Sequence, residues 1–387
     1  MRVAGLMSGT SADGIDVAVV DLVPDGDVLG ASLVALRSVA YPPAVRSAVE
    51  AALPPREVTA RDWCVLDTVV GQAFAAAAAE VTAEVGAVEL LVSHGQTVFH
   101  WVDGGEVRGT LQVGQPAWLA EVTGLPVVSD LRARDVAAGG QGAPLVSAFD
   151  VLWLGSRPGR PVALNLGGIA NVTADLAGAP VAYDTGPANT LVDVAVGRLT
   201  DGAQAYDRDG ERGARGVVDD RLLARMLADP YFARPAPKTT GRELFHGGWL
   251  DTALDGRRLD DDVIATLTAL TARTVADAVR RHEATEVVAA GGGTRNPTLM
   301  AMLRAALGGT PVLTTDELGL PSGAKEAVAF AVLGYLTVHG HPSTVPSATG
   351  ARHASLLGSV TPGVGGLPRP GRQEAPRSLV IGAATPA

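Results

Sequence analysis

Cysteine is almost absent from this chain of 387 residues, which has only Cys64. A single cysteine excludes an intrachain disulfide and a zinc site built on cysteines. No run of about 18 apolar residues lacks charges and glycine breaks, so no membrane span is expected. The first residues reach Gly, Ser and Asp too early for the apolar core of a signal peptide. We therefore expect a soluble protein of the cytoplasm.

Positive charge is also scarce, with 31 Lys and Arg against 41 Asp and Glu and a net charge of −10. This balance disfavours a basic groove for nucleic acid. Hydrophobic residues make up 47% of the chain and charged residues 19%. Such a composition buries large cores and excludes a wholly disordered chain. At about 150 residues per domain, the length predicts two or three domains.

Three common signatures of catalysis or cofactor binding are missing. The sequence contains neither a G-x-x-x-x-G-K-[ST] motif nor a G-x-G-x-x-G motif between a strand and a helix, which disfavours P-loop and Rossmann sites. It also lacks G-x-S-x-G, and no histidine adjoins Ser8 or Ser11. A hydrolase triad is therefore disfavoured.

The apolar runs predict short strands that alternate with helices, a pattern typical of an α/β protein. Strands are expected over residues 2–6, 15–23, 88–92, 110–113, 126–129, 161–166, 170–176, 180–183, 286–290 and 311–315. Helices are expected over residues 65–85, 116–123, 190–199, 217–228, 262–282, 297–307 and 323–338. Both halves begin with a strand, a turn rich in small residues, and a strand ending in Asp-Leu, which we interpret as a weak internal repeat.

This repeat predicts two lobes. We expect the first over residues 1–150 and the second over residues 151–363, with the last helix as a candidate to pack back on the first lobe. Residues 364–387 are rich in proline and glycine without apolar periodicity, so a disordered tail is expected.

Three Gly-rich turns follow predicted strands, at residues 5–14, 166–171 and 289–296. Glycine allows backbone N–H groups to approach phosphate oxygens, and Ser and Thr hydroxyls add donors without bulk. One such turn is most often a plain hairpin. Three in one chain, two of them in matching units, favour phosphate binding.

Two aspartates are candidates for chemistry. Asp13 lies among the donors of the first turn, where a carboxylate repels phosphate unless a metal ion lies between them. A turn cap is an equally good interpretation of Asp13. Asp184 follows a predicted strand and precedes a Gly-Pro turn and a helix, a position that faces the cleft in α/β sheets. It is a candidate general base, and the alternative is a helix cap.

Other polar residues have plainer interpretations. Lys325 and Glu326 open the last predicted helix, and a solvated first turn is the simpler reading of Lys325. His94 and His100 flank a short loop after a strand. Without a second metal-type spacing nearby, they predict a hydrogen-bonded scaffold rather than a zinc site.

Seven segments, taken in order, resemble the anhydro-N-acetylmuramic acid kinase family over nearly the whole chain to about residue 360. They are GLMSGTSADGID from residue 5, SHGQT from 93, GGQGAPLV from 139, NLGGIANVT from 165, DTGPAN from 184, GGGTRNP from 291 and AKEAVAF from 324. The departures are small: Ala188, for example, stands where the family has glycine, and Leu131 replaces an aromatic residue.

The resemblance implies a two-lobed fold of the actin, sugar-kinase and Hsp70 type, which is ribonuclease H-like, with ATP in the cleft between the lobes. It implies a homodimer that phosphorylates a small anhydro sugar during peptidoglycan recycling. In the implied reaction, water opens the 1,6-anhydro ring of 1,6-anhydro-N-acetylmuramic acid while O6 receives the γ-phosphoryl group. The products are N-acetylmuramic acid 6-phosphate and ADP. A kinase for another anhydro sugar, such as levoglucosan, and a non-enzymatic nucleotide sensor are the alternatives; the presence of Asp184 disfavours the sensor.

The same resemblance implies roles for individual residues. Asp184 matches the family's base. The implied ATP contacts are Gly9, Thr10, Ser11, Ala12, Asp13, Gly14, Ile15, Asp16, Gly167, Gly168, Gly291, Gly292, Gly293 and Asn296. The implied sugar contacts are Thr97, Asp130, Arg132 and Glu326. Mg²⁺ is expected at the β- and γ-phosphates, with Asp13 reaching it through water. Arg132 is the candidate partner of the lactyl carboxylate, because a guanidinium holds a carboxylate bidentately.

Overall fold

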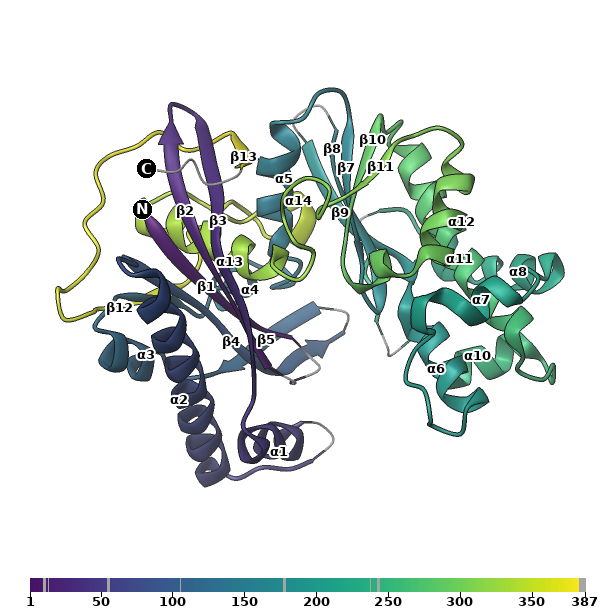
Figure 1. Ribbon diagram of the computed structural model, residues 1–387, viewed down its shortest axis with the longest axis horizontal. Coiled ribbons are helices and arrows are strands. Elements are labelled where there is room, and N and C mark those ends of the chain that lie inside the picture. The colour runs from purple at the N-terminus through teal and green to yellow at the C-terminus, as the bar shows by residue number, and fades with distance from the viewer. Residues whose placement is uncertain are drawn as a thin grey trace. The chain divides into compact units, whose positions relative to one another are not determined.

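The computed structural model describes residues 1–9, 12, 14–53, 56–104, 106–176, 179–236, 238–241 and 244–382. The chain divides into two compact units (Figure 1). Unit 1 comprises Met1–Ser156 and Gly319–Ala387, and unit 2 comprises Arg157–Leu318. The division differs from the expected lobes, because residues 319–363 belong to unit 1 rather than to the second lobe.

Unit 1 contains an eight-stranded sheet. Its strands are β1 (Arg2–Ser8), β2 (Gly14–Asp25), β3 (Val28–Ala40), β4 (Leu90–Asp103), β5 (Glu106–Val113), β6 (Val127–Ser129), β12 (Ser359–Thr361) and β13 (Ser378–Gly382). Their order is β12-β6-β4-β1-β2-β3-β13, and β5 pairs with β4. The strands β1, β4 and β6 run parallel, whereas β2 is antiparallel to both β1 and β3.

Unit 2 repeats this arrangement in a five-stranded sheet. Its strands are β7 (Pro161–Leu166), β8 (Ile169–Leu176), β9 (Ala179–Pro187), β10 (Glu286–Ala290) and β11 (Val312–Thr314). The order β11-β10-β7-β8-β9 matches β6-β4-β1-β2-β3 strand for strand, with the same parallel and antiparallel pairs. The shared order confirms the predicted duplicated, ribonuclease H-like fold of the actin-like ATPases.

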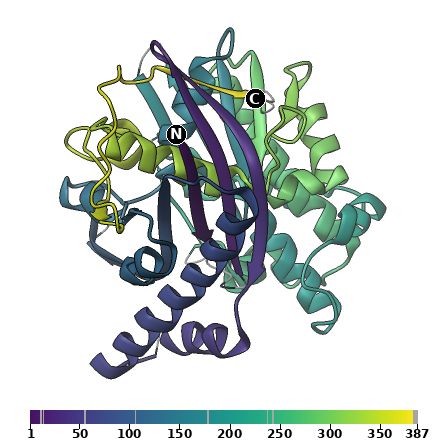
Figure 2. The ribbon, with the colours of Figure 1, turned by 60° about the vertical axis from the view of Figure 1, so that its left-hand side comes forward.

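Helices cover both faces of the sheet in unit 1 (Figures 1 and 2). They are α1 (Pro43–Ala52), α2 (Ala60–Val85), α3 (Pro116–Thr123), α4 (Ala133–Ala137), α5 (Val146–Gly155), α13 (Lys325–Val338) and α14 (Pro346–Thr349). Successive strand residues point to opposite faces. Leu6 accordingly joins a core cluster with Phe74 of α2, while a Cβ at Gly5 would lie 2.0 Å from the Ala327 carbonyl oxygen of α13. The bare Gly5 therefore allows α13 to pack directly on β1.

The helix α2 is long and apolar enough to cross a membrane by length and composition. Its beginning is fixed by a capping box, in which Thr59 and Asp62 bond each other's backbone, and it ends at Gly86, whose φ is 63°. One face, including Phe74, is buried in the core of unit 1. These contacts are those of a core helix that covers a sheet.

Unit 2 surrounds its sheet with nine helical segments among the residues described. They are α6 (Asn189–Leu199), η1 (Arg208–Gly210), α7 (Glu211–Arg215), α8 (Asp220–Leu227), α9 (Pro230–Ala233), α10 (Gly247–Leu254), α11 (Asp261–Arg281), η2 (Gly292–Arg295) and α12 (Pro297–Leu307). The central helix is α11, which contributes Val275 and Val279 to the core against the sheet. Its N-terminal half contributes Ile264 and Leu267 to a second core with α6, α8 and α10.

The expectation of a disordered tail is wrong for the part of it that forms β13. This strand pairs in parallel with β3, and Leu379 is completely buried. The Tyr335 hydroxyl of α13 also donates a hydrogen bond to Gln373. Local composition did not reveal this strand, because its hydrogen-bond partners lie more than 340 residues earlier in the chain.

Candidate active site

The first phosphate-type turn joins β1 to β2 in unit 1. Gly9, Ala12 and Gly14 are described there, whereas Thr10, Ser11 and Asp13 lie outside the described residues. Gln96 of β4 supports the turn, because its Nε2 donates to the Gly9 carbonyl at 3.1 Å. A Cβ at Gly14 would lie 2.6 Å from the Val39 carbonyl oxygen. Only glycine therefore allows β2 to start this close to β3.

Beside this turn lies a pocket of about 360 Å³ in unit 1, lined by Gly9, Gly14, Asp16, Ser38 and Glu326 among others. The Ser38 hydroxyl donates to the Asp16 carboxylate. Glu326 keeps an exposed surface at the pocket. The protein around it still removes part of the water from its carboxylate, and this desolvation raises its pKa. Arg132 and Lys325 lower this pKa, and Asp16 raises it further. Three residues expected at the nucleotide, Gly9, Gly14 and Asp16, and one expected at the sugar, Glu326, thus share one acidic pocket.

The interpretation of Lys325 as a solvated residue is wrong. Its side chain is 5% exposed, and Nζ lies 2.7 Å from a carboxylate oxygen of Asp150 in α5. A buried ion pair is strongly destabilised when one partner is removed. The pair therefore fixes the first turn of α13, and with it the backbone that presents Glu326.

Arg132, a candidate sugar contact, is anchored by two neighbours. Its Nε donates to His94 Nε2 at 2.8 Å, and Nη1 donates to the Gly142 carbonyl at 2.7 Å. Because His94 Nδ1 faces the Gly95 carbonyl oxygen at 2.9 Å, the proton of the neutral ring belongs on Nδ1. Burial and the Arg132 charge lower the pKa of His94 well below its usual value. The expectation of a scaffold role for His94 agrees with these contacts.

The other two sugar candidates occupy different places. Asp130 follows β6 with a left-handed φ of 54°, lines a pocket next to α2, and has a pKa raised by burial. Thr97 of β4 accepts a hydrogen bond from Gln112 Nε2 at 3.1 Å. Only Arg132 and Glu326 of the four candidates interact electrostatically with each other.

The second phosphate-type turn joins β7 to β8 in unit 2. The DTGPAN segment closes on this turn, because the backbone N–H of Ala188 donates to the Gly168 carbonyl at 2.9 Å and that of Asn189 to the Gly167 carbonyl at 3.1 Å. The third Gly-rich segment adjoins it as well. A Cβ at Gly291 would lie 2.8 Å from the Leu166 carbonyl oxygen. The structure thus brings Gly167, Gly168 and Gly291 together.

A pocket of about 460 Å³ in unit 2 is lined by Gly292 and Asn296 of the expected nucleotide set. The Asn296 side chain also caps α12, accepting from the Leu299 N–H at 3.0 Å. Asp207 of the same pocket is buried and accepts from the backbone of Arg212 and Gly213. The sequence reasoning missed Asp207. The available signal was the run DRDGERG over 207–213, since Asp and Gly at this density indicate a structured turn.

Asp184 lies in β9 and is held by Tyr231 of α9 and by residues of the segment that follows this helix. Its N–H donates to the Lys238 carbonyl at 3.0 Å, and its carbonyl accepts from the Tyr231 hydroxyl at 2.7 Å. The carboxylate accepts from the Thr240 N–H at 2.9 Å. Lys238 closes this segment, because its Nζ donates to the carbonyls of Tyr231 and Phe232. The Asp184 carboxylate is thus fixed in one orientation.

The described residues contain no group of three or more His, Cys, Asp or Glu that could hold a metal ion. An ion held mainly by phosphate oxygens needs only one or two carboxylates, and Asp16 supplies one beside the first turn. Two sheets of equal order, each with a Gly-rich hairpin between its first two strands, define a protein of the actin-like ATPase class.

Comparison with known proteins supplies the family. The sequence model of the anhydro-N-acetylmuramic acid kinase family matches residues 1–363. A kinase of this name from Rhodococcus erythropolis is 58% identical over 381 residues, covering 95% of this chain and 96% of the relative. Another from Streptomyces avermitilis is 59% identical over 386 residues, covering 98% and 100%. The chain therefore belongs to the anhydro-N-acetylmuramic acid kinase family, and it is a kinase.

Solved structures show only a distant likeness. Component A of (R)-2-hydroxyglutaryl-CoA dehydratase from Acidaminococcus fermentans aligns with a TM-score of 0.41 and 15% identity, covering 86% of this chain and 96% of that one. A ROK family glucokinase from Streptomyces griseus aligns with a TM-score of 0.36 and 16% identity, covering 86% and 99%. These scores are too low to bear on function, so the fold assignment rests on the strand order.

Proposed function

We propose that this protein hydrolytically opens the ring of 1,6-anhydro-N-acetylmuramic acid and phosphorylates O6 at the expense of ATP. In this sugar O6 is tied to C1 by an ether bridge, so there is no free 6-hydroxyl to phosphorylate. Water adds to C1, the C1–O6 bond breaks, and the released O6 takes the γ-phosphoryl group, leaving ADP. Opening an acetal in this way resembles inverting glycoside hydrolysis, in which one carboxylate activates the water.

Asp184 is the proposed base, and its fixed carboxylate is the observation that carries the proposal. The Thr240 N–H binds Oδ2 at 2.9 Å, while the Asp184 backbone is held on both sides by Lys238 and Tyr231. A general base must be positioned within hydrogen-bond reach of the proton it removes. In the proposed step, the carboxylate takes a proton from the water as the C1–O bond forms.

The two hairpin turns and the pocket at Asn296 are the proposed nucleotide contacts. Backbone N–H groups at Gly9, Gly14, Gly167 and Gly168 suit phosphate oxygens, since glycine permits close approach. Mg²⁺ would neutralise charge on the β- and γ-phosphates. Asp16 is a described carboxylate suited to hold it, and Asp13 stays a prediction.

The proposed sugar contacts are Thr97, Asp130, Arg132 and Glu326. Arg132 is anchored through Nε and Nη1, which leaves Nη2 to donate to the lactyl carboxylate. A hydrogen bond between two charged groups is stronger than one between neutral groups. Because peptidoglycan supplies the anhydro sugar, we also propose a role in its recycling in the cytoplasm. A homodimer remains part of this proposal.

The test is an ADP-release assay with ATP and a panel of 1,6-anhydro sugars, with and without the N-acetyl and lactyl groups. The muramyl sugar should give the highest kcat/KM, and mass spectrometry in ¹⁸O-water should place the label on C1 of the product. Preference for levoglucosan, or retention of unlabelled C1 oxygen, would contradict the proposal.

A further inference from the structure

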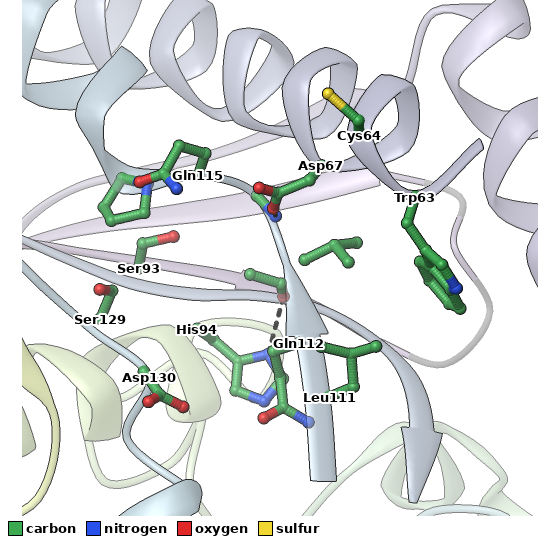
Figure 3. A pocket seen from close by; sticks show the side chains of 14 residues that line it. Trp63, Cys64, Asp67, Ser93, His94, Leu111, Gln112, Gln115, Ser129 and Asp130 are labelled. Atoms are coloured by element: carbon green, nitrogen blue, oxygen red, sulfur yellow. Dashed lines mark hydrogen bonds between the residues drawn. The ribbon is translucent and has the colours of Figure 1, made fainter. Parts of the chain in front are cut away.

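A pocket of about 490 Å³ opens in unit 1 next to the N-terminal turns of α2, and of the residues given a role so far only Asp130 and the scaffold residue His94 line it. Figure 3 shows Trp63, Cys64 and Asp67 of α2 on one side, with Ser93 of β4, Gln112 of β5 and Asp130 toward the other. Its volume lies in the range of small-molecule sites, about 300–1,000 Å³. The pocket is therefore large enough for a monosaccharide.

Two polar atoms in the pocket wall are buried without a partner. The Ser93 side chain is 1% exposed, and its Oγ makes no hydrogen bond. Gln112 Nε2 donates to Thr97 Oγ1 at 3.1 Å and to Thr110 Oγ1 at 2.8 Å, which fixes the amide so that the buried Oε1 has no donor. Unsatisfied buried groups are costly, so their retention at a pocket indicates a ligand that supplies the missing donors.

The charged groups that line the pocket indicate the chemical class of its ligand. Among the described residues that line it, none is lysine or arginine, whereas Asp67 and Asp130 present carboxylates. Asp67 uses one carboxylate oxygen to accept from the Gly114 N–H at 2.7 Å. Such a wall is rich in acceptors and repels anions, while Trp63 offers an apolar face. The matching ligand is uncharged and rich in donors, as are the hydroxyl groups and amide N–H of a neutral carbohydrate.

His94 lies between this pocket and the guanidinium of Arg132. The imidazole belongs to the pocket wall, and its Nε2 accepts from Arg132 Nε at 2.8 Å. The guanidinium therefore lies behind the ring rather than in the pocket. A sugar with one carboxylate substituent would place its neutral groups in the pocket and its carboxylate toward Arg132.

We propose that this pocket binds the uncharged hydroxyl and acetamido groups of the sugar, with Ser93 and Gln112 as contacts that set specificity. This inference rests on the proposed function and adds the site that receives the neutral part of the substrate. Ser93 Oγ and Gln112 Oε1 accept from the ligand, and the two carboxylates exclude the lactyl group from this end.

Cys64 provides a binding assay, because it is the only cysteine of the chain and is exposed at this pocket. N-ethylmaleimide labelling, followed by intact-mass analysis, measures its accessibility. At a sugar concentration tenfold above Kd, mass action predicts about tenfold slower labelling. Lactate, which has only the acidic part, should give no protection. An unchanged labelling rate with saturating muramyl sugar would overturn the assignment.

A pair of matched substitutions gives a second, independent readout. Ser93→Ala removes the unpartnered hydroxyl, and Ser343→Ala removes another buried hydroxyl without a partner, outside this pocket. Neither change should lower Tm, because no folded-state hydrogen bond is lost. Ser93→Ala should raise KM by roughly 2–13-fold, the value of one neutral hydrogen bond, equally for anhydro sugars with and without the lactyl group. Ser343→Ala should leave KM unchanged.

The outcomes separate this inference from the proposed function. Kinase activity on the muramyl sugar with no protection of Cys64, or with an unchanged KM in Ser93→Ala, would overturn the pocket assignment alone. Absence of turnover on every anhydro sugar would overturn the proposed function. Protection of Cys64 from labelling measures binding and does not require turnover. If no anhydro sugar is turned over, protection by a panel of neutral sugars therefore still tests whether the pocket binds carbohydrate.

Discussion

Replacement of Asp184 by asparagine tests the base in this kinase. In the structure, the Asp184 carboxylate accepts one hydrogen bond from the Thr240 N–H at 2.9 Å, and an asparagine carbonyl can accept the same bond. The backbone contacts to Lys238 and Tyr231 do not involve the side chain. Asp184→Asn should therefore keep the geometry of the loop and remove only the ability to take a proton.

The expected magnitude follows from these contacts. Loss of a general base costs about 10²–10⁴-fold in rate, which is about 2.7–5.5 kcal/mol of barrier. The upper end is expected, because activation of water and departure of O6 belong to one step. Folding should lose only about 1 kcal/mol, the difference between a charge-assisted and a neutral hydrogen bond. Tm should therefore fall by no more than about 2–4 °C.

The assay is ADP release with the muramyl sugar, together with KM for ATP. Asp184→Asn should lower kcat by the stated factor and change KM for ATP by less than about threefold, since the glycine turns are untouched. Asp251→Asn is the matched control, because this exposed carboxylate of α10 forms a surface ion pair with Arg198 and has no role in the candidate site. Its kcat should equal that of the wild type. A kcat within tenfold of wild type for Asp184→Asn would refute the assignment of the base.

Three further predictions concern substrate binding, pH and the tail. Arg132→Ala should raise KM for the muramyl sugar by about 10–150-fold, and much less for a sugar without the lactyl group; steady-state kinetics showing equal losses would remove Arg132 from the lactyl contact. Burial lowers the pKa of His94 from its usual 6.5, so the unfolded chain takes up a proton that the folded one resists. Calorimetry should therefore show full stability above pH 6.5 and a loss of up to about 1.4 kcal/mol per pH unit below it, with a shallower slope in His94→Gln; equal slopes would contradict this cause. Removal of residues 364–387 should lower Tm by several degrees, because it exposes the β3 edge and deletes the buried Leu379, whose replacement by alanine alone should cost about 2–5 kcal/mol; an unchanged Tm would show that β13 does not contribute to stability.

Elements with strong local signals could be predicted from the sequence. The strand β7 has its expected bounds, Pro161–Leu166, and α3 has its expected bounds, Pro116–Thr123. The helix α12 begins after the Asn296 cap with proline in its first turn and ends at a left-handed Gly308. In these cases the interactions that start and stop the element lie within a few residues of sequence.

Elements defined by distant partners could not be predicted in this way. The sequence reasoning missed β3, whose side chains are mostly only half-buried, and β13, which lies in a proline- and glycine-rich segment. It offered α13 only as a candidate to pack back on the first lobe, whereas in the structure this helix belongs to unit 1, where a Cβ at Gly334 would lie 2.1 Å from the Val92 side chain. Each of these depends on packing between segments far apart in the chain. Such packing does not produce a periodic pattern of apolar residues in the local sequence.

The sequence by itself determined the family, the duplicated fold and the motifs of the candidate site, because glycine turns and strand-end carboxylates are local patterns that the fold repeats. Only the tertiary structure decided which groups are paired. It buried Lys325 against Asp150, fixed the Asp184 carboxylate with the Thr240 N–H, and left Ser93 and Gln112 with buried polar atoms that have no partner. Pairing depends on distances of a few ångströms between segments that are remote in sequence, and composition and spacing do not contain those distances.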